Sequence, residues 1–252
     1  MAIHKTEAIV IDRKDYRETS YLLSLFTADF GKIHAQAKGA KRKIGKFGSS
    51  FVPLSFIEIV FYESVHGSLN IISQADLIEH FGGIDKDIEK YCYGSYFLEL
   101  INAAMGIGDK NKEIFQLLKN FLSFLDKEDN IPHVVQVFEI KFLNLSGFKP
   151  NLDFCVHCDG QIFDKSKFSY ILGGLLCEKC FNFDENAQNL MKGTIATLRH
   201  IEKIELKKLS GFKIVPSVFI ELEKLLRSFI SYHITEEFKS LELLKKVRYS
   251  YV

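Results

Sequence analysis

Four of the five cysteines in this chain form two Cys-x-x-Cys pairs. Cys155 and Cys158 make the first pair, and Cys177 and Cys180 make the second. Two residues between cysteines allow one tight turn to present both thiolates to a metal ion, and the intervening chain can bring the pairs together. Four thiolates complete the tetrahedral shell that zinc prefers and leave no position for an activated water. The spacing therefore predicts one structural Zn²⁺ ion.

Other readings of the cysteines are less suitable. A thioredoxin-like redox site needs only one Cys-x-x-Cys pair, placed at the N-terminus of a helix. His157 lies inside the first pair and could replace one cysteine as a ligand, so that alternative stays open. Cys92 lies on an apolar helical stripe and is expected to be a buried structural residue.

Positive charge is concentrated in one segment, although the net charge of the chain is only +1. Residues 30–57 contain no Asp or Glu. The cations of this window are Lys32, Lys38, Lys41, Arg42, Lys43 and Lys46. Lys14 and Arg17 come shortly before the next predicted strand and extend the same surface. Such a segment is expected to bind nucleic-acid phosphates without reading sequence, although an ordinary solvated hairpin would have the same composition.

Three aromatic residues flank these cations and could stack on bases. They are Tyr16, Phe47 and Phe51, and a core role is at least as suitable for Phe51. We expect the lysines and arginines, and not the rings, to carry nucleic-acid binding.

The elements that must position these groups fall into two classes. Short apolar and β-branched runs with turns marked by glycine predict five strands, at residues 6–11, 21–27, 32–37, 56–62 and 69–73. Five strands in this length suit a small closed barrel, either an OB-fold or an SH3-like barrel. Helical spacing then predicts helices within residues 86–105, 114–125, 132–147, 190–201, 218–232 and 236–247, with Ser217 as an N-cap.

The predicted fold class is therefore α+β. Residues 1–80 are expected to form a five-stranded OB-fold barrel that binds DNA, and residues 81–252 an all-helical domain with a zinc-binding insert at about 150–183. The hydrophobic content of 47% is sufficient for a packed core. No apolar run reaches the length of a membrane span, and no signal peptide precedes the first strand, so we expect a cytoplasmic protein.

Several segments together resemble the RecO family of bacterial recombination mediators. In the first half these are DYRETSYLL and LFT within residues 15–27, GKI at 31–33, and the basic run AKGAKRK at 37–43. In the second half they are LSGFKP at 145–150 and GGLLC at 173–177. The resemblance runs from about residue 3 to residue 240 in the family's order, and it is loose only in the C-terminal helix.

The resemblance implies a protein that binds single- and double-stranded DNA and anneals complementary strands. It also implies a role with RecR in loading the RecA recombinase onto DNA coated by single-stranded-DNA-binding protein, in the bacterial cytoplasm at the nucleoid. A groove between helices would accept the acidic C-terminal tail of the coating protein. Basic residues that could meet this tail, or form an ordinary exposed face, are Arg199, Lys203, Lys207 and Lys208.

Two rival functions belong to other classes. A zinc-ribbon adaptor would bind only proteins, and its basic loop would be dispensable. An enzyme of nucleic acids would need paired carboxylates for Mg²⁺ or a lysine nucleophile in a recognisable setting. The acidic run at residues 126–129 is expected to lie solvated in an interhelix loop, so no catalytic residues are predicted and the protein is expected not to be an enzyme.

Overall fold

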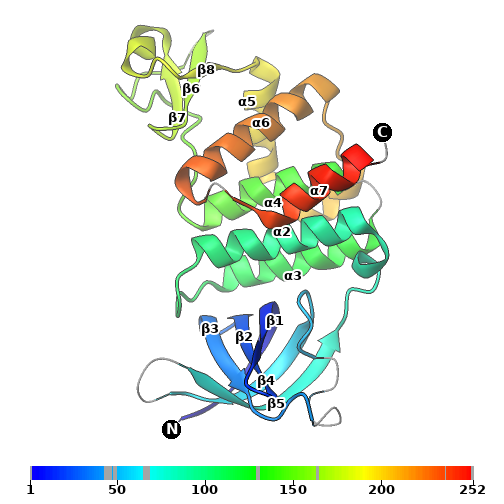
Figure 1. Ribbon diagram of the computed structural model, residues 1–252. Coiled ribbons are helices and arrows are strands. Elements are labelled where there is room, and N and C mark those ends of the chain that lie inside the picture. Colours follow the sequence, from blue (N-terminus) through cyan, green and yellow to red (C-terminus); the bar gives the residue numbers. More distant parts are fainter. Residues whose placement is uncertain are drawn as a thin grey trace. The chain divides into compact units, whose positions relative to one another are not determined.

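The computed structural model describes residues 2–42, 47, 50–64, 69–128, 131–162, 165–235 and 237–250. By packing, the chain forms two compact units (Figure 1). Unit 1 contains Met1–Lys127 and Phe238–Val252, and unit 2 contains Glu128–Glu237. The boundary predicted after residue 80 falls where the barrel ends and the helices begin. The division by packing is different, because unit 1 contains three α-helices in addition to the barrel.

A closed barrel of five strands begins unit 1. The strands are β1 (Ile3–Tyr16), β2 (Ser20–Thr27), β3 (Gly31–Ala37), β4 (Phe56–Tyr62) and β5 (Asn70–Glu79). Their order around the barrel is β1-β2-β3-β5-β4, with β3 and β5 parallel and β1 closing onto β4. This arrangement is an OB-fold, so it decides between the two barrels that the sequence allowed.

The barrel closes because β1 is long enough to pair with two neighbours. Its first half, Ile3 to Ile9, pairs with β4, and its second half, Ala8 to Tyr16, pairs with β2. Alternate residues of β4 point inward, so Ile57, Ile59 and Phe61 are buried in the barrel core. The far end of β1 carries mostly polar side chains and pairs with the start of β2, which pairs on its other side with β3.

Four helical segments complete unit 1. They are the 3₁₀ turn η1 (Ile84–Lys86) and the α-helices α2 (Ile88–Ala104), α3 (Lys112–Lys127) and α7 (Lys239–Ser250). Asp126, which was expected to be solvated, instead accepts hydrogen bonds at Oδ1 from the main-chain N–H groups of Gly83, at 2.6 Å, and Ile84, at 3.0 Å. The prediction for Asp126 was wrong because a carboxylate can satisfy the free N–H groups at the start of a helical turn.

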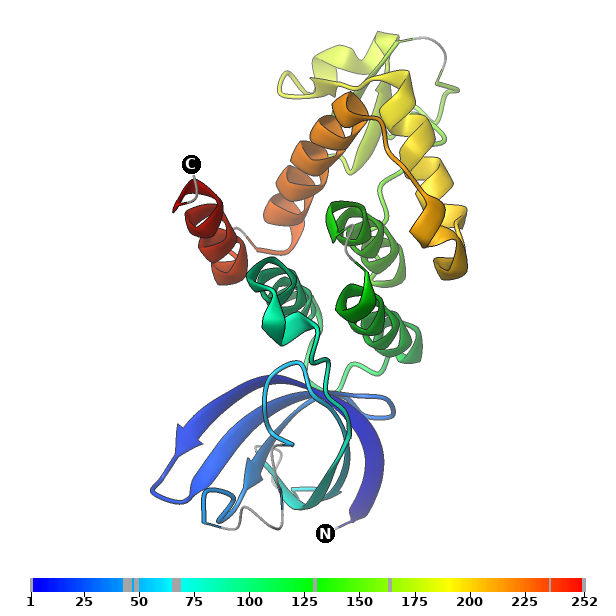
Figure 2. The same cartoon turned by 90° about the vertical axis from the view of Figure 1, so that its right-hand side faces the viewer.

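Helix α7 packs along α2, although the whole of unit 2 separates them in the sequence (Figure 2). The Ser240 hydroxyl donates to Glu99 Oε2 at 2.8 Å, and the ring of Phe238 meets Tyr96 edge-on at 4.9 Å between centroids. At the other end of α7, Arg248 forms an ion pair with Glu89 of α2. The chain therefore leaves unit 1, builds unit 2 and returns to complete unit 1.

Unit 2 contains α4 (Ile131–Leu145), α5 (Lys192–Lys203), the 3₁₀ segment η3 (Leu206–Gly211) and α6 (Pro216–His233). Helix α6 begins one residue before the predicted N-cap Ser217, and its N-cap is Val215. That prediction was wrong because Pro216 has a fixed φ and no N–H to satisfy, which suits the first helical position. Among the described helices, none combines the length and the apolar character needed to cross a membrane.

A small module lies between α4 and α5. It consists of a three-stranded sheet in the order β7-β6-β8 and the 3₁₀ segment η2 (Glu178–Phe183). The strands are β6 (Ser166–Ser169), β7 (Gly174–Cys177) and β8 (Gln188–Asn189). The module carries both Cys-x-x-Cys pairs at the place that the sequence predicts.

Candidate metal centre and nucleic-acid interface

The first cysteine pair lies on a tight turn closed by main-chain hydrogen bonds. The N–H of Cys155 donates to the Gly160 carbonyl at 2.9 Å, and the N–H of Asp159 donates to the Cys155 carbonyl at 2.9 Å. Asp159 adopts a φ of 55°, a left-handed conformation that Asp tolerates better than most residues. The turn therefore presents Cys155 and Cys158 toward the same side.

The second pair lies where β7 ends and η2 begins. Cys177 is the last residue of β7, and Cys180 lies in the 3₁₀ segment that follows. The N–H of Val156 donates to the Leu175 carbonyl at 2.8 Å, so the first turn is held against β7. Gly174 permits this approach, because a Cβ there would lie 2.3 Å from the Asn151 carbonyl oxygen.

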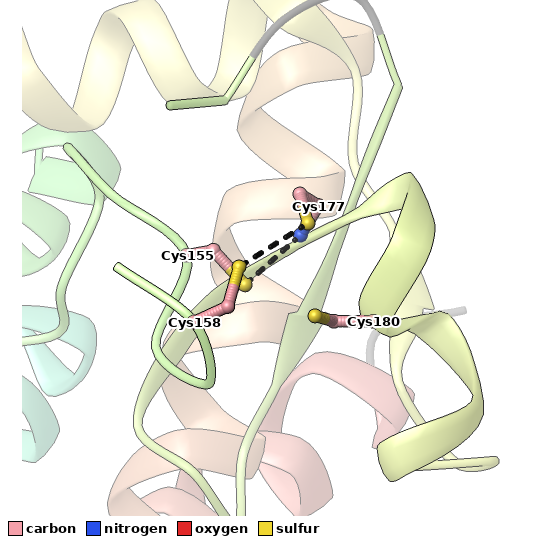
Figure 3. A group of neighbouring side chains, drawn as sticks. All are labelled: Cys155, Cys158, Cys177 and Cys180. Atoms are coloured by element: carbon pink, nitrogen blue, oxygen red, sulfur yellow. Dashed lines mark hydrogen bonds between the residues drawn. The ribbon is translucent and has the colours of Figure 1, made fainter. Parts of the chain in front are cut away.

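The four cysteine sulfur atoms lie within 4.8 Å of one another, and their side chains converge in Figure 3. The sulfur atoms of Cys158 and Cys177 are 3.8 Å apart. A tetrahedral thiolate site with arms of about 2.3 Å has edges of roughly 3.8 Å, so this spacing fits a bound metal ion. The main-chain N–H of Cys177 also points at the Cys155 sulfur, at 3.4 Å, and N–H donors of this kind stabilise metal-bound thiolates.

The thiols of the cluster differ in their affinity for protons. Burial opposes ionisation of Cys155, but main-chain N–H groups, first that of Cys177, lower the pKa of its thiol to about 6. Burial and the neighbouring thiols raise the pKa of Cys180 to about 12. A cation that binds all four sulfur atoms must therefore displace protons, and its affinity depends on pH.

His157 lies at the edge of this cluster. Its Nδ1 is 3.7 Å from the sulfur of Cys180, and its ring stacks on Phe183 with 3.4 Å between centroids. The described residues that could hold a metal here are the four cysteines. Cys92 is not part of this cluster and is fully buried in α2, which confirms its predicted burial.

Two basic segments, distant in sequence, meet at one end of the barrel. The N–H of Lys41 donates to the Thr19 carbonyl at 3.0 Å, and the N–H of Gly39 points at the Ser20 hydroxyl oxygen at 3.4 Å. These bonds attach the segment after β3 to the turn between β1 and β2. We use the name basic hairpin surface for the cations carried by these two segments: Arg13, Lys14, Arg17, Lys38, Lys41 and Arg42.

The cations of this surface differ in how far nearby carboxylates neutralise them. Lys41 Nζ lies 2.9 Å from Asp15, and Lys14 Nζ lies 3.5 Å from Asp12. Four exposed cations have no carboxylate partner among the described residues: Arg13, Arg17, Lys38 and Arg42. These two carboxylates were not expected near the cations, because residues 30–57 contain no acid. Asp12 and Asp15 come from β1, which lies earlier in the sequence.

Arg13 was not among the residues predicted from the sequence to bind nucleic acid. Its guanidinium lies over the ring of Tyr21, at 4.8 Å from the centroid, and Lys41 Nζ lies 5.6 Å from the same centroid. The available signal was the sequence Arg13-Lys14 close to Arg17. The position of Arg13 over the Tyr21 ring follows from the continuation of β1 to Tyr16, whereas the first strand was expected to end at Ile11.

Other predicted site residues lie elsewhere. Lys32 is buried, with only 8% of its surface exposed, and its ammonium donates to the main-chain carbonyl of Asn102 at 2.6 Å. Lys32 is therefore not available to phosphates. Phe47 and Phe51 pack into the barrel core with 5.3 Å between ring centroids, which corrects the idea that they stack on bases.

Lys43 and Lys46 lie outside the described residues, as does the side chain of Lys207. The Arg199 guanidinium binds the Leu152 carbonyl, so this cation holds the chain that leads into the first cysteine turn. Lys203 and Lys208 are exposed in unit 2.

Comparisons with known proteins cover almost the whole chain. Residues 1–81 match the family model for the N-terminal part of recombination protein O, and residues 85–242 match the model for its C-terminal part. The chain is 30% identical to the DNA repair protein RecO of Alkaliphilus metalliredigens over 245 residues, which cover 96% of this chain and 99% of the relative. It is 31% identical to the DNA repair protein RecO of Clostridium kluyveri over 252 residues, covering 98% and 95% of the two chains. The resemblance found in the sequence is confirmed, and the chain belongs to the RecO family of DNA repair proteins.

Proposed function

We propose that this protein is a non-enzymatic recombination mediator that binds single- and double-stranded DNA and anneals complementary strands. The observation that carries the proposal is the basic hairpin surface on the OB-fold barrel. The main-chain hydrogen bond from Lys41 to Thr19 joins the two segments that carry its cations, and Arg17, Lys38 and Arg42 have no carboxylate partner among the described residues. Residues 1–80 would then be the DNA-binding domain.

Phosphate neutralisation supplies the mechanism. Cations that contact phosphates release condensed counterions, so affinity is independent of sequence and falls as salt rises. Two DNA strands repel each other, and a surface that neutralises both lowers the barrier to their pairing. Arg17 and Arg42 can each hold a phosphate through two parallel hydrogen bonds, whereas Lys38 acts as a point charge.

The partners follow from membership of the family. We propose that the protein acts in the bacterial cytoplasm at the nucleoid, with RecR, to help load RecA onto DNA coated by single-stranded-DNA-binding protein. Unit 2 would accept the acidic tail of the coating protein, with Lys203 and Lys208 as the exposed cations that meet its carboxylates.

The cysteine cluster is proposed to hold one structural Zn²⁺ ion through Cys155, Cys158, Cys177 and Cys180. When bound, the ion supplies a cross-link between the first cysteine turn and the end of β7. The residues themselves do the positioning: Asn151, Leu152 and Val156 are held to the module or to α5 by main-chain and Arg199 hydrogen bonds. The module thereby fixes the chain between α4 and α5.

Annealing tests this proposal. Two complementary labelled oligonucleotides, each coated with the single-stranded-DNA-binding protein of the same organism, are mixed with and without the purified full chain. We expect faster annealing with the protein, and loss of the acceleration at high salt. A matched variant with Arg17 and Arg42 replaced by Gln should lose most of the acceleration, whereas Lys86→Gln, at an exposed lysine of η1, should keep it.

An adaptor that binds only proteins remains the second candidate. It is favoured by large apolar side chains exposed on the module, with Phe154 49%, Ile171 52% and Phe183 59% exposed. This function predicts no binding to bare oligonucleotides at moderate salt. No annealing together with no binding to bare DNA would therefore replace the mediator by the adaptor.

A further inference from the structure

The four cysteines of the metal centre differ in their access to solvent. Cys158 is exposed and Cys177 is partly exposed, and their sulfur atoms are neighbours at 3.8 Å. Together they form an accessible edge of the cluster, with one thiol from each Cys-x-x-Cys pair.

The other two cysteines are covered. Cys155 has no exposed surface and packs with Leu176 and Ala187 in the small apolar cluster of the module. Cys180 is 4% exposed, and the His157 ring lies against it and stacks in turn on Phe183. Each Cys-x-x-Cys pair therefore joins one covered cysteine to one cysteine that is at least partly exposed, and Cys158 with Cys177 is the pair in which neither residue is covered.

We propose that Cys158 and Cys177 form a peroxide-sensitive pair whose oxidation to a disulfide opens the metal centre. The proposal rests on the metal site proposed above and is independent of DNA binding. Oxidation of thiolates follows thiolate character and exposure. When all four sulfur atoms are metal ligands they are all thiolates, so exposure distinguishes them and favours Cys158 and Cys177. The reacting sulfur atoms must approach from 3.8 Å to about 2.05 Å, a small movement for residues on two surface turns.

The chemistry balances with hydrogen peroxide as the oxidant. The Cys158 thiolate attacks one peroxide oxygen, the O–O bond breaks, and a sulfenic acid and a hydroxide ion form. The Cys177 thiolate then attacks the Cys158 sulfur, the S–O bond breaks, and a second hydroxide ion leaves. In total, two thiolates each lose one electron and one peroxide molecule is reduced.

The consequence for the module is a loss of metal ligands. Only Cys155 and Cys180 remain as thiolates, and two sulfur ligands do not complete a tetrahedral zinc site. The link through the metal from Cys155 to Cys180 of η2 is then lost, whereas the new disulfide still joins the first turn to the end of β7. Reduction by a dithiol restores the four ligands.

Disulfide mapping on the full chain tests the pairing. The zinc-loaded protein is treated with hydrogen peroxide, released zinc is followed with a chromophoric chelator, and peptides are mapped by mass spectrometry without reduction. A Cys92→Ala background removes the fifth cysteine, so that every disulfide found belongs to the module. We expect a Cys158–Cys177 disulfide to form in step with zinc release, and both to reverse when a dithiol and zinc are added.

Matched histidine variants test the role of access. Cys158→His and Cys180→His each retain four ligands that zinc accepts, but only the first removes a thiol of the accessible edge. We expect peroxide to release zinc severalfold more slowly from Cys158→His than from Cys180→His. Equal slowing in both variants would overturn the proposal. If a histidine variant loses its metal, the disulfide map of the protein with all four module cysteines still shows which cysteines pair.

The failure of this proposal is distinguishable from failure of the metal site. A chain that carries zinc and yields a disulfide within either Cys-x-x-Cys pair, or sulfinic acid without a disulfide, overturns the accessible pair and keeps the metal centre. A chain purified without any bound metal overturns the zinc assignment and this proposal together. Neither result bears on strand annealing, which is measured separately.

Discussion

The ammonium nitrogen of Lys32, on strand β3, lies 2.6 Å from the main-chain carbonyl oxygen of Asn102, in the last turn of helix α2. The final carbonyl groups of a helix have no partner within the helix, and they carry partial negative charge. Lys32 therefore caps α2 from the barrel. The same residue accepts at its carbonyl a hydrogen bond from the N–H of Gly108, at 2.9 Å, which fixes the chain that follows the helix.

Replacing Lys32 by Met should lower stability without changing DNA affinity. The variant removes a hydrogen bond from a charged donor, so we expect the free energy of unfolding to fall by about 1.5–3 kcal/mol. Urea unfolding of the variant measures this change, with the exposed Lys38→Met as the control for stability. If Lys32→Met had normal stability but bound DNA weakly, the result would contradict this role and would mean that Lys32 contacts DNA.

The free energy of unfolding should depend on pH through the side-chain amine of Lys32. Burial lowers the pKa of Lys32 below its ordinary value of 10.5. Between the lowered pKa and 10.5 the unfolded chain binds more protons at this group than the folded chain does, so this group makes the free energy of unfolding rise with pH. We expect the stability advantage of the wild type over Lys32→Met to increase as the pH rises toward 10.5, as measured by denaturant unfolding at a series of pH values. An advantage that falls over this range would contradict the burial of the amine.

Charge removal on the basic hairpin surface should change the salt dependence of DNA binding. Arg17→Gln with Arg42→Gln removes two cations that have no carboxylate partner among the described residues. Each lost phosphate contact should reduce the slope of log affinity against log salt by about 0.9 on duplex DNA and about 0.7 on single strands. Fluorescence anisotropy over a salt series gives both slopes. Lys86→Gln is the control and should leave both slopes unchanged. If the double variant also left them unchanged, DNA would not contact Arg17 or Arg42.

Loss of any of the four clustered cysteines should abolish stoichiometric metal binding. We expect about one zinc ion per wild-type chain by elemental analysis, and little in Cys155→Ser, because three thiolates hold the ion less tightly than four. Cys92→Ala should retain the metal, since Cys92 lies outside the cluster. Acidification should release the ion as protons compete for the thiolates. Full zinc content in Cys155→Ser would show that this thiolate is not a ligand.

Gly174→Ala should disrupt the module without touching a ligand. The added Cβ would lie 2.3 Å from the Asn151 carbonyl oxygen and 2.6 Å from a methyl group of Val156, so the first cysteine turn would have to move away from β7. We expect weaker zinc binding in a competition assay with a chelator. Gly82→Ala is the matched control, because a Cβ there meets no heavy atom within 4 Å. Equal zinc affinity in both variants would mean that β7 does not position the first turn.

The metal cluster was predicted correctly because the two ligands of each pair lie only three positions apart in the sequence. Each Cys-x-x-Cys pair occupies one turn, and four sulfur atoms in a small module can meet in few ways. The relative access of Cys158 and Cys180 was not predictable in this manner, since it depends on where the His157 ring and η2 lie.

The barrel was predicted from alternating apolar residues, and the errors lie where alternation fails. Residues 12–15 of β1 are all charged, so the strand was expected to end at Ile11, yet pairing with β2 continues it to Tyr16. The burial of Lys32 was hidden for a different reason. Its partner Asn102 lies 70 residues away, and a lysine beside other cations is indistinguishable in sequence from a surface residue.

The return of α7 to unit 1 has a consequence for synthesis on the ribosome. Ser240 and Glu99, which bind each other, are 141 residues apart, so α2 emerges long before the helix that covers it. The nascent chain must carry Tyr96 without Phe238 while all of unit 2 is translated. Because domains that are complete in sequence can fold as they emerge, unit 2 is able to fold before unit 1 is finished. Unit 1 is therefore completed only after the whole of unit 2 has been translated, and until then the face of α2 that α7 covers lacks this helix.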